Sequence, residues 1–161
     1  MEKFKELILE SKRKISIADH MLNVSYKLVQ DPKILLSVTL SIYTAVEKAM
    51  TSVLEYERLF KRVPAFTEGF DSKFTIFRGK FQEKHNIQKE DVKLIIELRE
   101  LYMAHKQSPV EFAKKDKFVI ASDDYDLKTL ELDDVKKYMS RAKVFIQEMD
   151  KFVSKNNGIF R

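Results

Sequence analysis

The hydrophobic positions of this chain recur at steps of three and four residues over long stretches, a spacing typical of helices that bury one face. Residues 2–29 show one such apolar stripe and are expected to form the first helix. Asp31 and Pro32 then have the form of a helix cap followed by a first-turn proline, which predicts a second helix from there to about Arg62. Because the connection between them is short, the two helices are expected to pack as antiparallel neighbours.

The second half of the chain shows the same spacing over about 89–106 and about 132–155, and two more long helices are expected there. Between them, Ser108-Pro109-Val110-Glu111 has the form of a capping box with proline at the first helical position. We expect it to open a short turn of helix that ends near Lys115. Residues 118–121 are apolar and β-prone, but the run is short.

A run of phenylalanines begins within the predicted loop over 61–72, which contains a proline and a glycine, and continues beyond it. Its spacing predicts a short third helix over about 71–84 that fills the core with aromatic side chains. A base-stacking platform is the alternative, because Lys73, Arg78 and Lys80 lie nearby. The five positions are Phe66, Phe70, Phe74, Phe77 and Phe81.

The pattern as a whole predicts one domain over 1–161 with an all-α fold, an up-and-down four-helix bundle with a short additional helix. Only 3 glycines and 3 prolines interrupt the chain, which is low for a β-rich protein. The absence of cysteine excludes disulfides and thiolate metal sites. The charged, amphipathic start MEKFKELILESKRK is unlike a signal peptide, and we find no run of about 20 apolar residues. We therefore expect a cytoplasmic protein without a membrane partner.

Composition and motifs narrow the chemistry further. Lysine and arginine number 30 against 25 acidic residues, a net charge of +5 that permits a polyanionic partner without requiring one. No Glu-x-x-His pair of the kind that holds a di-iron centre is present, and neither is a glycine-rich phosphate loop or a serine-hydrolase motif. With only 3 histidines and no cysteine, we expect no metal site and no cofactor.

Arginine and histidine are the remaining candidates, because arginine is a permanent phosphate-binding cation and histidine transfers protons near neutral pH. Each histidine follows an arginine by six or seven positions, so position along the chain must discriminate between the pairs. The first two pairs are expected to lie on a solvated helix face and at a helix end. The third lies at the end of a strongly apolar helix, whose last turn can tighten so that the two side chains converge. A histidine there is also favourable for helix-dipole reasons alone. The pairs are Arg13 with His20, Arg78 with His85, and Arg99 with His105.

From about residue 3 to 155 the chain resembles the HEPN domains of prokaryotes, small all-α proteins that typically dimerise. The residues that carry the resemblance are Arg99 and His105 with five residues between them, the segment 45–49 expected to pack behind them, and the segment 118–125 before the last helix. The resemblance implies metal-independent RNA cleavage in a cleft between two protomers. His105 would move a proton at the ribose 2′-hydroxyl or the leaving oxygen, and Arg99 would hold the scissile phosphate. The product would be a cyclic phosphate, which excludes DNA as substrate.

Three further residues, Glu47, Glu100 and Tyr102, are expected to support the site. Glu100 stands directly after the arginine, where many nuclease members of this family have Asn, Asp or His, and its carboxylate would either orient Arg99 or repel RNA. Tyr102 is expected to be a packing residue. Glu47 is either an ordinary helix-face residue, with no salt-bridge partner four positions ahead, or a partly buried carboxylate that pairs with Arg99.

Three functions remain open on the sequence. The first is a ribonuclease of the toxin or defence type, acting as a homodimer through the faces beside the helices 32–62 and 89–106. The second is a non-catalytic nucleotide-binding or accessory module that acts with a nucleotidyltransferase, an antitoxin or another partner. Family members that a nucleotidyltransferase modifies often carry a tyrosine shortly after the histidine. Here Lys106-Gln107-Ser108 follow His105, so the resemblance does not support that modification. The third is a structural interaction protein without a ligand.

Overall fold

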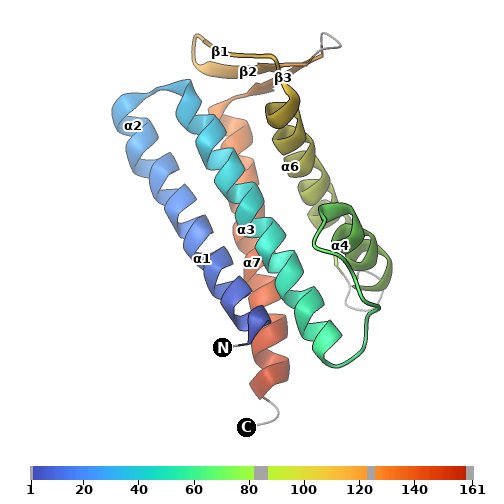
Figure 1. Cartoon of the computed structure of the whole chain (residues 1–161). Helices are drawn as coiled ribbons and strands as arrows, with labels where there is room; N and C mark the ends of the chain where they lie inside the picture. Colours follow the sequence, from blue (N-terminus) through green and yellow to red (C-terminus); the bar gives the residue numbers. More distant parts are fainter. Residues whose placement is uncertain (1, 82–86, 123–125, 159–161) are drawn as a thin grey trace.

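The computed structural model describes residues 2–81, 87–122 and 126–158, with side chains as far as residue 154. The chain is mostly helical, as predicted, with one small antiparallel sheet across the end of the helices that is opposite the two termini (Figure 1). The helical elements are α1 (Lys3–His20), the π-helical turn η1 (Met21–Ser25), α2 (Tyr26–Val29), α3 (Pro32–Leu59), α4 (Phe70–Ile76), the π-helical turn η2 (Phe77–Phe81), α6 (Lys89–Gln107) and α7 (Leu132–Gly158). The strands are β1 (Val110–Lys114), β2 (Lys117–Ala121) and β3 (Leu127–Leu130), in the order β1-β2-β3.

Helix α3 is the central element, in contact with α1, α6 and α7 (Figure 1). Helices α1 and α3 pack closely enough for two buried serines to form hydrogen bonds between them. Ser11 on α1 donates to the carbonyl of Ala45 on α3 at 2.6 Å, and Ser52 on α3 donates to the carbonyl of Phe4 on α1 at 2.7 Å. Because both hydroxyls find acceptors, neither serine is left with an unsatisfied polar group at the interface.

The predicted junction between the first two helices is confirmed. Elements α1, η1 and α2 follow one another without a break, and the run ends at Gln30, which adopts a left-handed backbone with φ 56°. Asp31 then caps α3 by accepting a hydrogen bond from the backbone N–H of Lys33 at 3.0 Å, with Pro32 at the first helical turn. Helix α3 ends at Leu59, three residues before the predicted end at Arg62.

The predicted helical turn over 109–115 is wrong, because Val110–Lys114 form strand β1 instead. Strand β1 pairs with β2 through a two-residue turn, in which Lys115 adopts a left-handed φ of 57°. Such turns normally carry glycine or asparagine, so a hairpin was not predictable from these residues. The β-prone run 118–121 does form a strand, and its buried side chains Phe118 and Ile120 pack on the ends of α3 and α6. The all-α expectation therefore holds for most of the chain, and this three-stranded sheet is the exception to it.

The phenylalanine run is largely a core feature, as its spacing predicted. Helix α4 and the turn η2 cover 70–81, and the predicted continuation to 84 lies outside the described residues. Phe77 and Phe81 are buried, and Phe77 meets the ring of Phe145 on α7 edge to face, at 6.0 Å between centroids. Rings buried in this way are closed to a nucleic-acid base, so a stacking platform made by these two residues is excluded.

Helix α3 is also long and apolar enough to cross a membrane by length and composition alone, with a mean hydropathy of 1.2 over its most apolar window. Within the structure 61% of that window is buried. The core helix of a folded domain meets the same criterion, and the contacts of α3 with α1, α6 and α7 account for its apolar residues.

Candidate functional site

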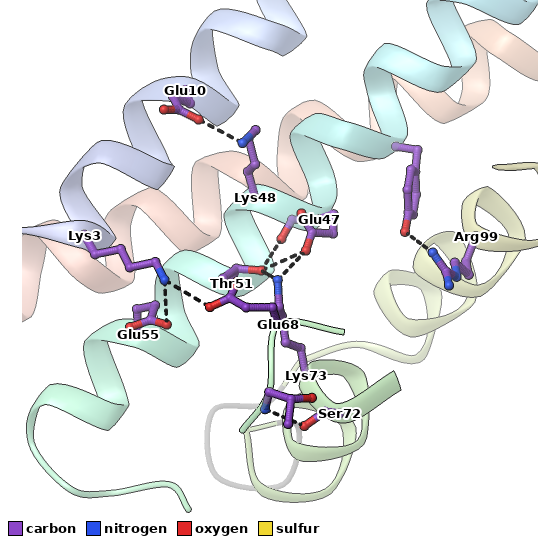
Figure 2. A network of polar contacts seen from close by, with 12 residues as sticks. Lys3, Glu10, Glu47, Lys48, Thr51, Glu55, Glu68, Ser72, Lys73 and Arg99 are labelled. Atoms are coloured by element: carbon purple, nitrogen blue, oxygen red, sulfur yellow. Dashed lines mark hydrogen bonds and ion pairs between the residues drawn. The ribbon is translucent and has the colours of Figure 1, made fainter. Parts of the chain in front are cut away.

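Arg99 lies in an aromatic cradle made by three elements. Its Nη1 donates a hydrogen bond to the hydroxyl of Tyr43 on α3 at 3.0 Å (Figure 2). The guanidinium carbon is 4.5 Å from the ring centroid of Phe70 on α4 and 5.5 Å from that of Tyr102, one turn further along α6. Aromatic faces attract a guanidinium and fix its plane. The cradle therefore immobilises the cation while leaving it half-buried rather than sealed.

The two tyrosines of the cradle stack on each other, with ring centroids 4.7 Å apart. This contact agrees with the predicted packing role of Tyr102. Burial raises the pKa of Tyr43, although the hydrogen bond from Arg99 acts in the opposite direction. Tyr43 is thus a neutral hydroxyl at physiological pH, and it accepts the hydrogen bond of Arg99 without neutralising the charge. Lys106 adds a second cation, with Nζ 4.9 Å from the ring centroid of Tyr102.

His105 is held from a different element. Its Nδ1 lies 2.8 Å and 3.0 Å from the two carboxylate oxygens of Glu111 on β1. The side chains of His105 and Glu111 are 32% and 22% exposed. Within the described ranges Nε2 has no hydrogen-bond partner. Sequence reasoning missed this contact, because it placed Glu111 in a capping box; only the strand alternation of β1 aims its carboxylate at α6.

The expected tightening of the last turn of α6 is absent, since the helix stays α-helical to Gln107. Six residues of α-helix separate Arg99 and His105 by about 9 Å along the axis and about 120° around it. Steps of three residues rotate by only about 60°, so Tyr102 lies between the two side chains on one continuous strip. No hydrogen bond joins Arg99 to His105 in the described part of the chain. The fold therefore does not bring the guanidinium of Arg99 and the imidazole of His105 together within one protomer.

Glu47 does not pair with Arg99. Its Oε1 accepts from Lys73 Nζ on α4 at 2.9 Å and from the hydroxyl of Thr51 at 3.1 Å (Figure 2). A partly buried carboxylate was one of the two alternatives for Glu47, but its partner is Lys73 from the aromatic run and not Arg99. Glu100 is exposed, and the nearest cation to it is Lys128 Nζ on β3, at 3.9 Å. The alternative in which Glu100 orients Arg99 finds no contact in the structure.

The other two arginine–histidine pairs differ from this one. Arg13 and His20 are both exposed on α1, as predicted for a solvated face. Arg78 is exposed on η2, whereas His85 lies outside the described residues. Among the arginine–histidine pairs whose two members are described, only Arg99 and His105 are both half-buried and held by side chains of other elements.

A groove of about 550 Å³ lies between α6 and α7, on the face of α6 turned away from Arg99. Its lining mixes both signs of charge, and Tyr138 stands within it. Burial raises the pKa of Tyr138 to about 12, with further contributions from nearby carboxylates. The basic lining residues are Lys89, Lys93, Lys137 and Arg141, and the acidic ones are Glu90, Glu97 and Asp134.

Comparison with known proteins gives no identification: no family model, no curated protein and no solved structure matches the chain. Over the described residues, no group of three or more His, Cys, Asp or Glu side chains is placed to hold a metal ion. A function for this chain must therefore be inferred from the residues of the site itself.

Proposed function

We propose that this protein is a HEPN-type, metal-independent endoribonuclease that works as a homodimer, with Arg99 and His105 as its reacting groups. The observation that carries the proposal is that a permanent cation and a partly exposed imidazole lie on one strip of α6, and that each is immobilised by another element of the fold. Immobilised groups of complementary chemistry are typical of reactive sites, because positioning lowers the cost of reaching the transition state.

Arg99 is suited to hold the scissile phosphate. Tyr43 takes one of its N–H donors, and the described residues supply no acceptor for the others. A guanidinium with free donors binds phosphate oxygens in pairs. Its contact with Phe70 fixes the direction in which those donors point. Charge that builds up on the phosphoryl oxygens in the transition state would meet a cation already in place.

His105 supplies proton transfer. In the proposed reaction the ribose 2′-oxygen attacks phosphorus and gives up its proton to an imidazole nitrogen. The bond from phosphorus to the 5′-oxygen breaks, and that oxygen takes a proton from an imidazolium. The products are a 2′,3′-cyclic phosphate and a free 5′-hydroxyl, so atoms and charge balance without a further reactant.

The dimer is part of the proposal, because one protomer holds Arg99 and His105 apart. We propose that α1 with α2, α3, α6 and α7 form a HEPN-like four-helix bundle, and that the faces beside α3 and α6 meet across a two-fold axis. An isologous contact would present two arginines and two histidines to one RNA strand. One imidazole would then act as base and the other as acid.

The decisive comparison is between matched pairs of variants. Cleavage of single-stranded RNA in the presence of EDTA should fall about 100-fold or more in Arg99→Ala and in His105→Ala. The same substitutions at Arg13 and His20, which are exposed on α1, should leave cleavage unchanged. Equal activity of His105→Ala and wild type, or no cleavage by the wild-type dimer between pH 5 and 9, would contradict the proposal.

A non-catalytic nucleotide-binding module is the second candidate, and the groove between α6 and α7 favours it. Four basic and three acidic side chains line that groove beside Tyr138, and the small excess of positive charge next to an aromatic ring suits an anionic ligand with a flat ring. In that case Lys137→Ala and Arg141→Ala would weaken nucleotide binding, and His105→Ala would not. A nucleotidyltransferase or antitoxin partner would be recovered with the protein on co-purification.

A further inference from the structure

We infer that Glu111 is a positioning residue: it keeps the proton of neutral His105 on Nδ1, so that Nε2 is the nitrogen that faces the substrate. The inference about the imidazole stands on the contact with Glu111 alone. Its consequence for cleavage rests on the function proposed above.

The geometry of the contact determines the tautomer. Both oxygens of Glu111 lie within hydrogen-bond distance of Nδ1, at 2.8 Å and 3.0 Å. An ionised carboxylate only accepts hydrogen bonds, so Nδ1 must carry the hydrogen in the neutral ring as well as in the charged one. The lone pair of the neutral ring then lies on Nε2, the nitrogen without a partner in the described residues. This is the arrangement that a general base needs.

The strand register explains why Glu111 and no neighbour meets the histidine. Side chains alternate along β1, so Val110 and Phe112 lie on the outer face, where both are exposed. Glu111 therefore lies on the inner face, opposite Ile120 on β2, which is buried against the ends of the helices. A slip of one residue would exchange the carboxylate for an apolar side chain.

Ser108 helps to fix that register at the point where α6 ends. Its hydroxyl lies 2.6 Å from the carbonyl of Ala121 on β2 and 2.7 Å from that of Val110, and it accepts from the Val110 N–H at 3.2 Å. The start of β1 is thereby tied both to the end of α6 and to its partner strand. The carboxylate of Glu111 is thus presented from an anchored backbone rather than from a free loop.

A favourable position at the helix C-terminus is the competing explanation of His105, because an imidazolium is stabilised there whichever element follows. That explanation gives the neutral ring no reason to keep its proton on Nδ1. The tautomer of the neutral ring therefore distinguishes a positioning role of Glu111 from a purely structural one.

Long-range nitrogen–proton NMR of the imidazole rings reports the tautomer directly. In the wild-type protein, above the pH at which the ring becomes neutral, His105 should be protonated on Nδ1 and bare on Nε2. His20, which is exposed and has no carboxylate partner among the residues that the structure describes, serves as the internal reference. In Glu111→Ala the His105 signals should move toward those of His20. The variant Glu111→Val, whose β-branched side chain suits a strand, guards against loss of the sheet.

Glu131→Ala is the matched control, since it removes a carboxylate that pairs with Lys117 and has no contact with His105. It should leave the tautomer unchanged. A wild-type His105 with its proton on Nε2, or a tautomer unaffected in folded Glu111→Val, overturns the inference. In the cleavage assay, Glu111→Ala should lower kcat about 10- to 100-fold with KM nearly unchanged, as for other residues that orient a reacting histidine. If the tautomer responds as expected and the wild-type protein cleaves no RNA, the proposed function fails while the role of Glu111 in orienting the ring stands.

Discussion

Lys73 on α4 reaches Glu47 on α3, with Nζ 2.9 Å from Oε1, and its side chain is only 8% exposed (Figure 2). The hydroxyl of Thr51 lies 3.4 Å from the same ammonium group. Phe70, one turn before Lys73 on α4, covers the guanidinium of Arg99. The buried ion pair therefore attaches to α3 the short helix that completes the cradle of the candidate phosphate-binding cation.

Removal of Lys73 should be costly. In Lys73→Met the carboxylate of Glu47 loses its charged partner, and loss of one member of a buried pair leaves an uncompensated charge. Because Glu47 keeps 23% of its side chain exposed, we expect the free energy of unfolding to fall by about 2 kcal/mol, less than the loss for a fully buried pair. Urea denaturation measures this change, and a double-mutant cycle with Glu47→Gln isolates the coupling.

The control for this cycle is the surface pair of Lys12 and Asp150, whose charged atoms are 2.6 Å apart. Lys12→Met should change the free energy of unfolding by less than about 1 kcal/mol, since the side chain of Lys12 is 47% exposed, against 8% for Lys73, and solvent screens such a pair. If Lys73→Met costs no more than Lys12→Met, the buried pair does not hold α4 in place.

Arg99→Lys tests whether the cradle orients a guanidinium or merely hosts a positive charge. Lysine keeps the charge but has neither the planar group that stacks on Phe70 nor paired donors for a phosphate. We expect cleavage to fall about 100-fold while the free energy of unfolding changes by about 1 kcal/mol or less. Single-turnover cleavage together with urea denaturation of the same samples separates the two effects. Full activity of the lysine variant would show that orientation of the cation is unimportant.

Tyr138 makes stability sensitive to alkaline pH. Burial raises its pKa from 10.0 to about 12, so between these values the folded state binds more protons than the unfolded state. Stability is then at its full value below pH 10 and declines as the pH rises toward 12. Tyr138→Phe removes this contribution, and its advantage over wild type in the free energy of unfolding should grow from pH 9 to pH 12. Parallel curves for the two proteins over that range would contradict the assigned burial.

The long helices could be predicted because each buries one face, and burial repeats with the helical period. The helix junction at Asp31-Pro32 could also be predicted, since its cap depends on two adjacent residues. Strand β1 was not predicted, because Ser108-Pro109-Val110-Glu111 suits a helix start and the turn at Lys115 lacks the usual glycine. These residues form a strand because they pair with β2, and pairing between strands cannot be predicted from the residues of one strand alone.

The sequence predicted the two candidate residues Arg99 and His105, but it did not predict the side chains that hold them. Arg99 and His105 were identified by their place at the end of an apolar helix. Their partners Tyr43 and Glu111 lie 56 and 6 positions away, and the contacts depend on how α3 and β1 pack against α6. For Glu47 the sequence left open an ordinary helix-face position and partial burial beside Arg99, and the placement of α4 determines that its partner is Lys73.

The central claim is that the imidazole and guanidinium of α6 cleave RNA through its 2′-hydroxyl without a metal ion. Analysis of the product ends after incubation of single-stranded RNA with the purified dimer in EDTA tests it most directly. The account predicts 2′,3′-cyclic phosphate ends, their loss in His105→Ala, and no cleavage of a DNA strand of the same sequence. Cleavage of the DNA strand, or the same product ends at the same rate from His105→Ala, would contradict it.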